Sequence, residues 1–460
     1  MKKFLPAARQ ECQFVYLLFR LPMVWLDLFV APIIAIVIYG IALALRPWVT
    51  YEENRKFFIP ALTLKLFGAI ALGALYQFYY GGGDTFSYFT HGARHVFDAF
   101  YNDTATGIKL IFNTNDYEGV YQYASRIWMY RDDTSYMVIR IASIFAIITG
   151  GTYSGTALLF AVVSFSGLWA MYMAFSKLFP NHLTGMAIAI LFIPSTIIWG
   201  SGILKDTITF ALLGWSTAAL IHLLYWRKRP VIWLIVLVLS MLLAFEIKEY
   251  IVLSFIPAAM AWAYFVWIKY IDNKMIRIVI APVSIILMIF LSLYTVYKVG
   301  ESSPRYSLDN LAKTAQITAY DIGRWTGKSA GSRYDLGDFD GTLSSMLKLA
   351  PEAINVSLFR PYLWEVNNPL MLLASLEGLV FLILTVIIVF RVLWHKNNIF
   401  RSPSAWFALV YSLTFAFAVG ISTYNFGTLF RYKIPLMPFY AILIVIAWRS
   451  SNQSEKISKA

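Results

Sequence analysis

Long apolar segments dominate this chain of 460 residues and limit what it can fold into. A helix needs about 20 predominantly apolar residues to cross the hydrocarbon core of a membrane. Segments that reach or approach this length lie at 28–45, 57–79, 155–175, 183–199, 207–226, 231–246, 250–268, 277–297, 368–391, 404–421 and 434–449. The sequence therefore predicts an all-α polytopic membrane protein with about 11–12 transmembrane helices.

The composition excludes several classes of protein. Hydrophobic residues make up 59% of the chain and charged residues only 14%, which excludes a cytosolic enzyme, since soluble domains are about half apolar and a quarter charged. The net charge of +13 fits cations retained on the cytoplasmic side of a membrane, so we expect no nucleic-acid partner. The single cysteine, Cys12, excludes an internal disulfide and a cysteine-based zinc site.

Lysine and arginine in the short connections set the expected orientation. Positive residues gather at 227–229, around 269–277, around 391–401 and in the C-terminal tail, and we place these connections in the cytoplasm. Successive connections then alternate between the two sides of the membrane only if the short apolar run 138–149 does not cross it. This run is predicted to be an interfacial or half-inserted helix.

The N-terminus leaves two topologies open. Its cations favour the cytoplasm, but a single span at 28–45 would put them outside. An additional entry into the membrane by residues 14–26 would restore the alternation. A cleavable signal peptide is not expected, because Arg20 interrupts the apolar region.

Two long polar stretches divide the chain into expected parts. These are an N-terminal membrane segment (1–56), a transmembrane core (57–297) with a first outer loop (81–136), a large extracytoplasmic loop (298–367), C-terminal transmembrane helices (368–450) and a cytoplasmic tail (451–460). Both outer loops are expected to contain interfacial helices. Most of the positive excess falls on the cytoplasmic side, which leaves the outer face near neutral and rich in acids.

The first outer loop begins with a glycine run followed by an acid. Residues 79–85 read Tyr-Tyr-Gly-Gly-Gly-Asp-Thr, and His91 and Arg94 follow shortly after. Three glycines allow a sharp turn and the close approach of a ligand, which presents Asp84 just beyond the bilayer. An alternative is that Asp84 only begins a helix. The run lacks the Gly-Lys-Ser/Thr ending of a P-loop.

Two charged pairs lie at the outer ends of predicted spans. Lys205-Asp206 follows a Trp-Gly-Ser-Gly stretch, and Lys248-Glu249 joins two shortened spans. Charges at this depth are costly in lipid, so the second pair indicates a water-filled recess. For the first pair, a helix cap with a snorkelling cation is the alternative. For the second, it is an exposed hairpin.

Two arginines stand beside aromatic residues and prolines. Arg360 lies in Phe-Arg-Pro-Tyr-Leu-Trp-Glu, and Arg431 lies where the last span begins. Such arginines can hold a phosphate or act as interfacial anchors. Glu377 is a further acid inside a predicted span, and Lys65 is its only obvious counterpart among the spans.

These positions together indicate a chemistry. A carboxylate can deprotonate a hydroxyl as general base, and cations can stabilise a departing phosphate. This combination on the outer face fits transfer from a lipid-linked phosphate sugar.

With these residues the chain resembles the GT-C superfamily, the polyprenyl-phosphate-sugar-dependent integral membrane glycosyltransferases that include protein O-mannosyltransferases and aminoarabinose transferases. The likeness covers roughly residues 57–268 and 425–449. It rests on Asp84, Arg140-Ile-Ala-Ser, Pro194-Ser, Asp206, Lys248 and the run Arg431-Tyr-Lys-Ile-Pro-Leu-Met-Pro438. The resemblance implies Asp84 as catalytic base.

The leading hypothesis is a glycosyltransferase in envelope glycan or polysaccharide assembly, in a bacterial inner membrane with an extracytoplasmic active face. Its expected partners are a polyprenyl-phosphate-linked sugar, a glycan, lipid or protein acceptor, and membrane lipid. The expected site residues besides Asp84 are Lys205, Lys248, Arg360 and Arg431 on the donor phosphate, and Asp206, Glu249, His91 and Arg94 as orienting or sugar-binding groups.

Two other functions remain open, as does a metal. A Wzy-type oligosaccharide polymerase or ligase would depend more on Arg360 and Arg431 than on Asp84. A transporter or scaffold is disfavoured because no internal duplication is visible. No cofactor is certain, although a divalent cation is possible. Its candidate ligands, which lack diagnostic spacing, are Asp84, His91, Asp132 and Asp133, with a weaker set at Asp335, Asp338 and Asp340.

Overall fold

The computed structural model describes residues 25–112, 116–271, 310–325, 332–337, 340–395 and 399–448, together with scattered residues between 273 and 294. Within these residues the chain is helical and has no strand, and Arg333 and Asn425 form an isolated β-bridge. The chain divides into two compact units. Unit 1 comprises residues 1–166 and 197–211, and unit 2 comprises residues 167–196 and 212–460.

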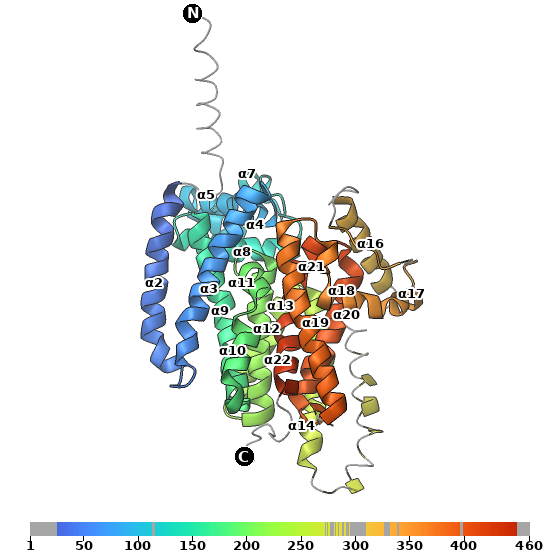
Figure 1. Cartoon of the computed structure of the whole chain (residues 1–460). Helices are drawn as coiled ribbons and strands as arrows, with labels where there is room; N and C mark the ends of the chain where they lie inside the picture. Colours follow the sequence, from blue (N-terminus) through green and yellow to red (C-terminus); the bar gives the residue numbers. More distant parts are fainter. Residues whose placement is uncertain are drawn as a thin grey trace, which may run out of the picture. The chain divides into compact units, whose positions relative to one another are not determined.

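Unit 1 begins with two long apolar helices, which Figure 1 shows in blue. They are α2 (Trp25–Val49) and α3 (Arg55–Ala74), and the π-helix η1 (Leu75–Tyr79) continues α3. Short helices follow: α4 (Asp84–Tyr88), η2 (Phe89–Ala93), α5 (Arg94–Asn102), α6 (Thr104–Phe112) and α7 (Tyr121–Ala124). The unit is completed by α8 (Asp133–Ile148) and by parts of α9 (Tyr153–Leu178), α11 (Pro194–Trp199) and α12 (Lys205–Ile221).

Unit 2 contains the remaining parts of α9, α11 and α12 and all later helices. Its elements up to residue 325 are η3 (Pro180–His182), α10 (Leu183–Leu191), η4 (His222–Trp226), α13 (Pro230–Ile247), α14 (Glu249–Trp267), η5 (Ile268–Tyr270) and α16 (Leu311–Trp325). The later ones are α17 (Leu343–Lys348), α18 (Ala350–Phe359), η7 (Leu363–Glu365), α19 (Pro369–His395), η8 (Ile399–Arg401), α20 (Pro403–Thr423), α21 (Phe426–Tyr432) and α22 (Met437–Trp448).

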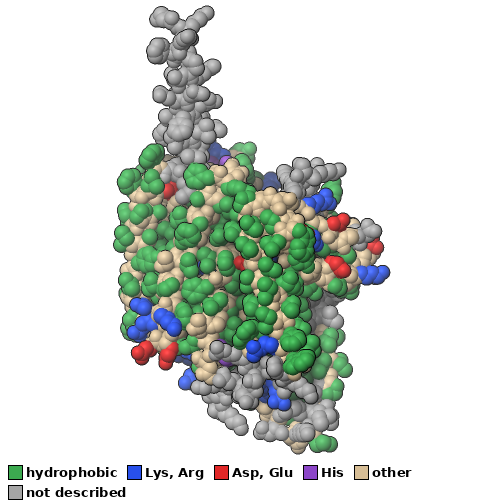
Figure 2. All heavy atoms as spheres, in the orientation of Figure 1, with side chains coloured by type: hydrophobic (Ala, Val, Ile, Leu, Met, Phe, Trp, Pro, Cys, Tyr) green, Lys and Arg blue, Asp and Glu red, His purple; other side chains and the backbone are tan. Residues whose placement is uncertain are grey.

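The prediction of an all-α polytopic membrane protein is confirmed in its coarse form. In the described part of the chain, 8 helices are long and apolar enough to cross a membrane, or up to 9 if one bent pair forms a single span. The eight are α2, α3 with η1, α9, α12 with η4, α13, α14 with η5, α19 and α20. In Figure 2 hydrophobic side chains cover the visible faces of α2, α3 and α19.

Two predicted spans are interrupted. Segment 183–199 is two helices, α10 and α11, because Pro194 has no N–H to continue a helical ladder. Segment 434–449 begins with a break, since α21 and α22 are bent by 67° around residues 433–436. Hydropathy alone did not reveal either break, because these residues are as apolar as those of a continuous helix.

Some predictions fall outside the described residues. Most of the predicted span 277–297, nearly all of the additional N-terminal entry (14–26), Asp338 and the tail after 448 belong to this group. The run 138–149 lies in α8, which has 16 residues and is not among the helices long enough to span. Its interfacial position stays a prediction.

Close helix packing in each unit depends on glycine. In unit 1 a Cβ on Gly68 of α3 would lie 2.1 Å from the carbonyl oxygen of Ile197. In unit 2 a Cβ on Gly214 of α12 would lie 2.4 Å from the carbonyl oxygen of Gly167 in α9. Small residues let membrane helices approach this closely, so larger side chains here would separate the helices.

Candidate functional site

The glycine run before Asp84 forms a sharp turn. Gly81, Gly82 and Gly83 all have positive φ angles, of 69°, 148° and 132°, which L-residues with a side chain rarely adopt. Asp84 is the first residue of α4, so it does begin a helix, and its side chain is half-buried. An acid in the first helical turn is favoured by the helix dipole.

The turn packs on Tyr76, which connects it to a second predicted segment. A Cβ on Gly83 would lie 2.6 Å from Cε1 of Tyr76, so only glycine fits there. The ring of Tyr76 contacts the ring of Trp199 edge-on, at 6.3 Å between centroids. Trp199 begins the Trp-Gly-Ser-Gly stretch that leads to Lys205. Two of the loops singled out in the sequence are therefore neighbours in unit 1.

Lys205 is held at the start of α8. Its Nζ donates to Thr134 Oγ1 (2.6 Å) and lies 3.7 Å from Asp132 Oδ2. Burial raises the pKa of Asp132, but hydrogen bonds from Ser135 and the charge of Lys205 outweigh it and lower the pKa overall. Asp206, which was expected to orient Lys205, is completely buried at the start of α12. The sequence did not identify Asp132 as the partner of Lys205, since 73 positions separate the two.

His91 and Arg94 make contacts within the first loop. The imidazole of His91 stacks on Trp128 at 3.7 Å, and burial lowers the pKa of this histidine. Arg94 donates to the carbonyl of Gly151 (2.7 Å) and lies 3.4 Å from Asp98. Both side chains thus hold parts of unit 1 together, and their predicted contact with a sugar stays a prediction.

The proposed metal ligands do not form a cluster among the described residues. No group of three or more His, Cys, Asp or Glu side chains in this part of the chain comes together in a way that could hold an ion. Asp335 and Asp340 accept hydrogen bonds from residues within their own turns. These bonds, from Ser345 first and then Thr342, lower the pKa of Asp340 to about 2.

The other candidates meet around α21 in unit 2. This seven-residue helix follows Tyr424, which has a positive φ of 47°, and the side chain of Asn425 caps it by accepting from the N–H of Thr428 (3.1 Å). Arg431 is in its last turn and is buried. Residues 332–336 pair with the chain just before α21, since Tyr334 N donates to Tyr424 O and Phe426 N donates to Ser332 O.

Lys248 and Arg431 both lie against Tyr432. The Lys248 ammonium is 4.5 Å from the centre of that ring, and the Arg431 guanidinium is 5.4 Å from it. Lys248 also lies 5.6 Å from the ring of Tyr250. Cations are attracted to aromatic faces, so these rings hold both charges in place. The neighbouring Glu249 has a buried carboxylate oxygen, Oε2, that accepts no hydrogen bond.

Arg360 lies at the other end of α21 and is already paired. Its guanidinium is 5.4 Å from the ring of Phe426. The single N–H of Nε is shared between the two carboxylate oxygens of Glu365, at 3.0 and 3.1 Å, and Nη2 donates a further hydrogen bond to the same carboxylate. The hydrogen bond and charge of Glu365 raise the pKa of Arg360 despite partial burial. The sequence motif contains both residues, but the pairing was not predicted.

The acid inside α19 has a different counterpart from the expected one. Lys65 donates to the carbonyl of Gly200 (2.9 Å) and lies over the ring of Phe210. Glu377 instead faces the charge of Lys433, a residue that the sequence did not single out. Both groups of this second pair are buried.

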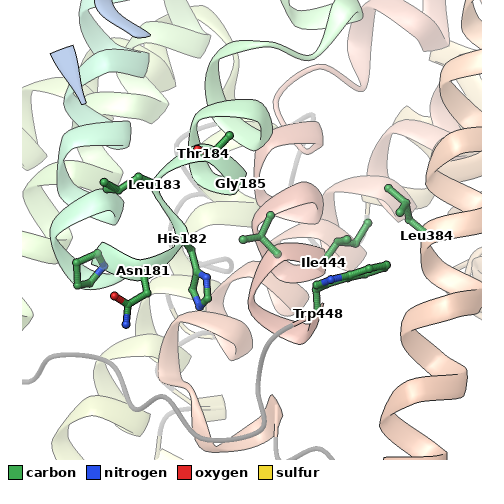
Figure 3. A pocket seen from close by; sticks show the side chains of 10 residues that line it. Asn181, His182, Leu183, Thr184, Gly185, Leu384, Ile444 and Trp448 are labelled. Atoms are coloured by element: carbon green, nitrogen blue, oxygen red, sulfur yellow. The ribbon is translucent and has the colours of Figure 1, made fainter. Parts of the chain in front are cut away.

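A cavity of about 500 Å³ lies at the end of α22 away from α21 (Figure 3). Asn181 and His182 lie on one side of it, with Trp448, Ile444 and Leu384 across from them. None of the predicted site residues lines this cavity.

Unit 2 thus brings Lys248 and Arg360 against the rings of α21, the helix that contains Arg431. In unit 1 the ring contact of Tyr76 with Trp199 joins the turn before Asp84 to the stretch before Lys205. The chain matches no protein-family model, no curated protein and no solved structure.

Proposed function

We propose that this protein is an integral membrane glycosyltransferase of the GT-C type, which moves a sugar from a polyprenyl-phosphate donor to an acceptor on the extracytoplasmic face. The single observation that carries this proposal is the arrangement around α21. Lys248 and Arg431 lie against Tyr432, and Arg360 lies against Phe426. Cations held against aromatic rings suit a ligand that joins a phosphate to apolar and sugar surfaces.

The three cations of this group have different roles in the proposal. Arg360 pairs with Glu365, so we assign the binding of the phosphate to Lys248 and Arg431. Arg431 is buried, and a charge in such a position acts more strongly than one in water. Both residues would stabilise the negative charge that develops on the departing phosphate.

Asp84 would act as the general base. Its carboxylate takes the proton of the acceptor hydroxyl, whose oxygen forms a bond to the anomeric carbon of the sugar. The bond from that carbon to the phosphate oxygen breaks, and the phosphate leaves with the electron pair. In unit 1, Lys205 shares its charge with Asp132, so we assign it a weaker part in phosphate binding than Lys248 or Arg431.

The test expresses Asp84→Asn or Glu118→Gln in a deletion strain, with protein levels in membranes checked. Glu118 is an exposed acid of the first loop to which no role is assigned, and it serves as the control. We expect Glu118→Gln to restore the sugar that the glycan of the deletion strain lacks, and Asp84→Asn not to restore it. Full activity of Asp84→Asn would disprove the role as base. Accumulation of single repeat units in the deletion strain would point to a polymerase instead.

One observation favours a second candidate, a transporter. In unit 2, two interrupted helices end at the buried pair Glu377 and Lys433, and interrupted helices with ionisable residues are found at transport sites. Substrate counterflow in proteoliposomes without any chemical turnover would support this candidate over the transferase.

A further inference from the structure

A cavity of about 770 Å³ lies in unit 1 between α2, η1 with α3, and the start of α9. This volume is within the range of small-molecule sites. Its walls are mainly apolar, with a few polar side chains. The lining residues that matter here are Ala31 and Ala35 on α2, Leu66 and Gln77 on the α3–η1 side, and Ser154 on α9.

Two hydrogen bonds between helices mark the length of the cavity. At one end, Asp27 of α2 accepts from the N–H of Ser154 (2.5 Å), and at the other, Tyr39 donates to Thr63 of α3 (2.8 Å). All four residues line the cavity. The 12 residues from Asp27 to Tyr39 span about 18 Å along α2, which is more than half of the roughly 30 Å hydrocarbon core. The cavity therefore runs along the membrane-spanning helices.

The middle of the α2 wall of the cavity, between Leu28 and Tyr39, contains two small residues. Ala31 and Ala35 line it, whereas Ile33 and Ile36 between and beside them are 59% and 70% exposed. Small residues normally let helices pack closely. Here they instead leave room between α2 and Leu66 of α3, enough for a slender apolar molecule.

One end of the cavity carries a polar group that lacks a partner. The hydroxyl of Ser154 is buried and makes no hydrogen bond. The carboxylate of Asp27 accepts from the backbone N–H of Ser154 and not from its hydroxyl. Gln77 and Phe78 line the cavity and belong to η1, which leads directly into the glycine turn before Asp84. The cavity wall thus includes the helical turn that precedes the glycine run and the candidate base.

We propose that this cavity binds the isoprenoid chain of the polyprenyl-phosphate donor, with the headgroup beyond η1 on the side of Asp84. The inference rests on the proposed function, because a lipid-linked donor is what connects an apolar cavity to a base. The chain lies between α2 and α3, and the Ser154 hydroxyl donates to the first polar atoms of the lipid.

The experiment uses the full-length protein in nanodiscs and a photoactivatable polyprenyl phosphate, with the labelled peptides identified by mass spectrometry. Photoactivatable phosphatidylethanolamine is the second probe. Ala35→Phe fills the cavity from α2, and Ile36→Phe adds the same group to the exposed face as matched control. Ala31→Phe is a second filling variant in case Ala35→Phe does not give monodisperse protein.

We expect polyprenyl phosphate to label peptides of α2 and α3, and this labelling to fall about tenfold or more in Ala35→Phe, since the added ring occupies the space of the chain. Ile36→Phe keeps wild-type labelling. Equal labelling by both probes, or unchanged labelling in both filling variants, overturns the inference. Labelling does not require turnover, so the two proposals can fail separately. Labelling of a protein that has no transferase activity would refute the proposed function and support the lipid site. Transferase activity without labelling of this cavity would refute the lipid site and support the proposed function.

Discussion

Glu377 and Lys433 are both buried in unit 2, and their opposite charges interact although no hydrogen bond joins them. Glu377 Oε2 accepts from the N–H of Ser195 (2.9 Å), in the first turn of α11, and Lys433 follows the last turn of α21. An acid at a helix N-terminus and a cation at a C-terminus are each favoured by the helix dipole. The pair therefore stabilises the ends of two interrupted helices.

Removing one member of this pair should destabilise unit 2 more than removing both. Glu377→Gln leaves Lys433 as an uncompensated buried cation, for which the cost is about 3–5 kcal/mol. Adding Lys433→Met should recover part of it, with a coupling of about 0.5–3 kcal/mol. The measurement is the fraction of monodisperse protein in detergent after heating. Glu246→Gln, at an exposed glutamate of α13, is the control.

A double variant as unstable as the sum of the two single variants would show that the two charges act independently. The interpretation of a coupled pair would then be wrong.

The fold was predictable where hydrophobic length decides it. Eight long helices match predicted spans, because about 20 apolar residues leave few alternatives. The breaks at Pro194 and around residues 433–436 were not predicted, since apolar residues next to a proline read as part of a span. Lys433 lies inside the quoted run 431–438, but the sequence did not show that it faces Glu377, because 56 positions separate the two.

The sequence predicted which residues of the candidate site are unusual, but it did not predict the contacts between them. The sequence identified Asp84, Lys205, Arg360 and Arg431 from glycine, proline and aromatic neighbours. It could not show that Asp132 pairs with Lys205, because their contact joins two helices far apart in the chain. Local motifs reveal which side chains are unusual, whereas tertiary packing decides which residues they pair with.

Variants of Lys205 and Asp132 can distinguish a phosphate-binding role of Lys205 from a purely structural one. If Lys205 binds the donor phosphate, Lys205→Met should raise KM for the donor about tenfold, the loss of one charge-assisted contact of about 1.4 kcal/mol. Asp132→Asn removes the competing acid and should leave KM unchanged or lower it. Steady-state kinetics in membrane vesicles measure both. An equal loss of folded protein in the two variants, with unchanged KM, would instead indicate a structural ion pair.

The pair of Arg360 and Glu365 should make stability depend on acid pH. Burial raises the pKa of Glu365, but the hydrogen bond from Arg360 outweighs it, so the folded pKa lies below the ordinary value of 4.5. The stability that the pair contributes is therefore complete above pH 4.5 and is lost as the pH falls through the folded pKa.

Glu365→Gln should remove this dependence. Melting temperatures of the variant and the wild type are compared at pH 7 and near pH 4, with Glu352→Gln, an exposed glutamate of α18, as control. We expect acidification to lower the melting temperature of the wild type more than that of Glu365→Gln. Parallel losses in all three proteins would assign the acid sensitivity to other groups.

The two cations beside Tyr432, Lys248 and Arg431, should matter for the chemical step rather than for the fold. Lys248→Gln and Arg431→Gln each remove a charge that would stabilise the departing phosphate, and by analogy with the loss of one oxyanion-hole donor we expect kcat to fall by about 10²–10³. Lys348→Gln, at an exposed lysine of α17, is the matched control and should keep wild-type kcat. Tyr432→Ala should lower kcat as well, because both charges lose the ring that holds them. A raised KM with unchanged kcat in these variants would mean that the cations bind donor and transition state equally well, and the leaving-group role would have to be given up.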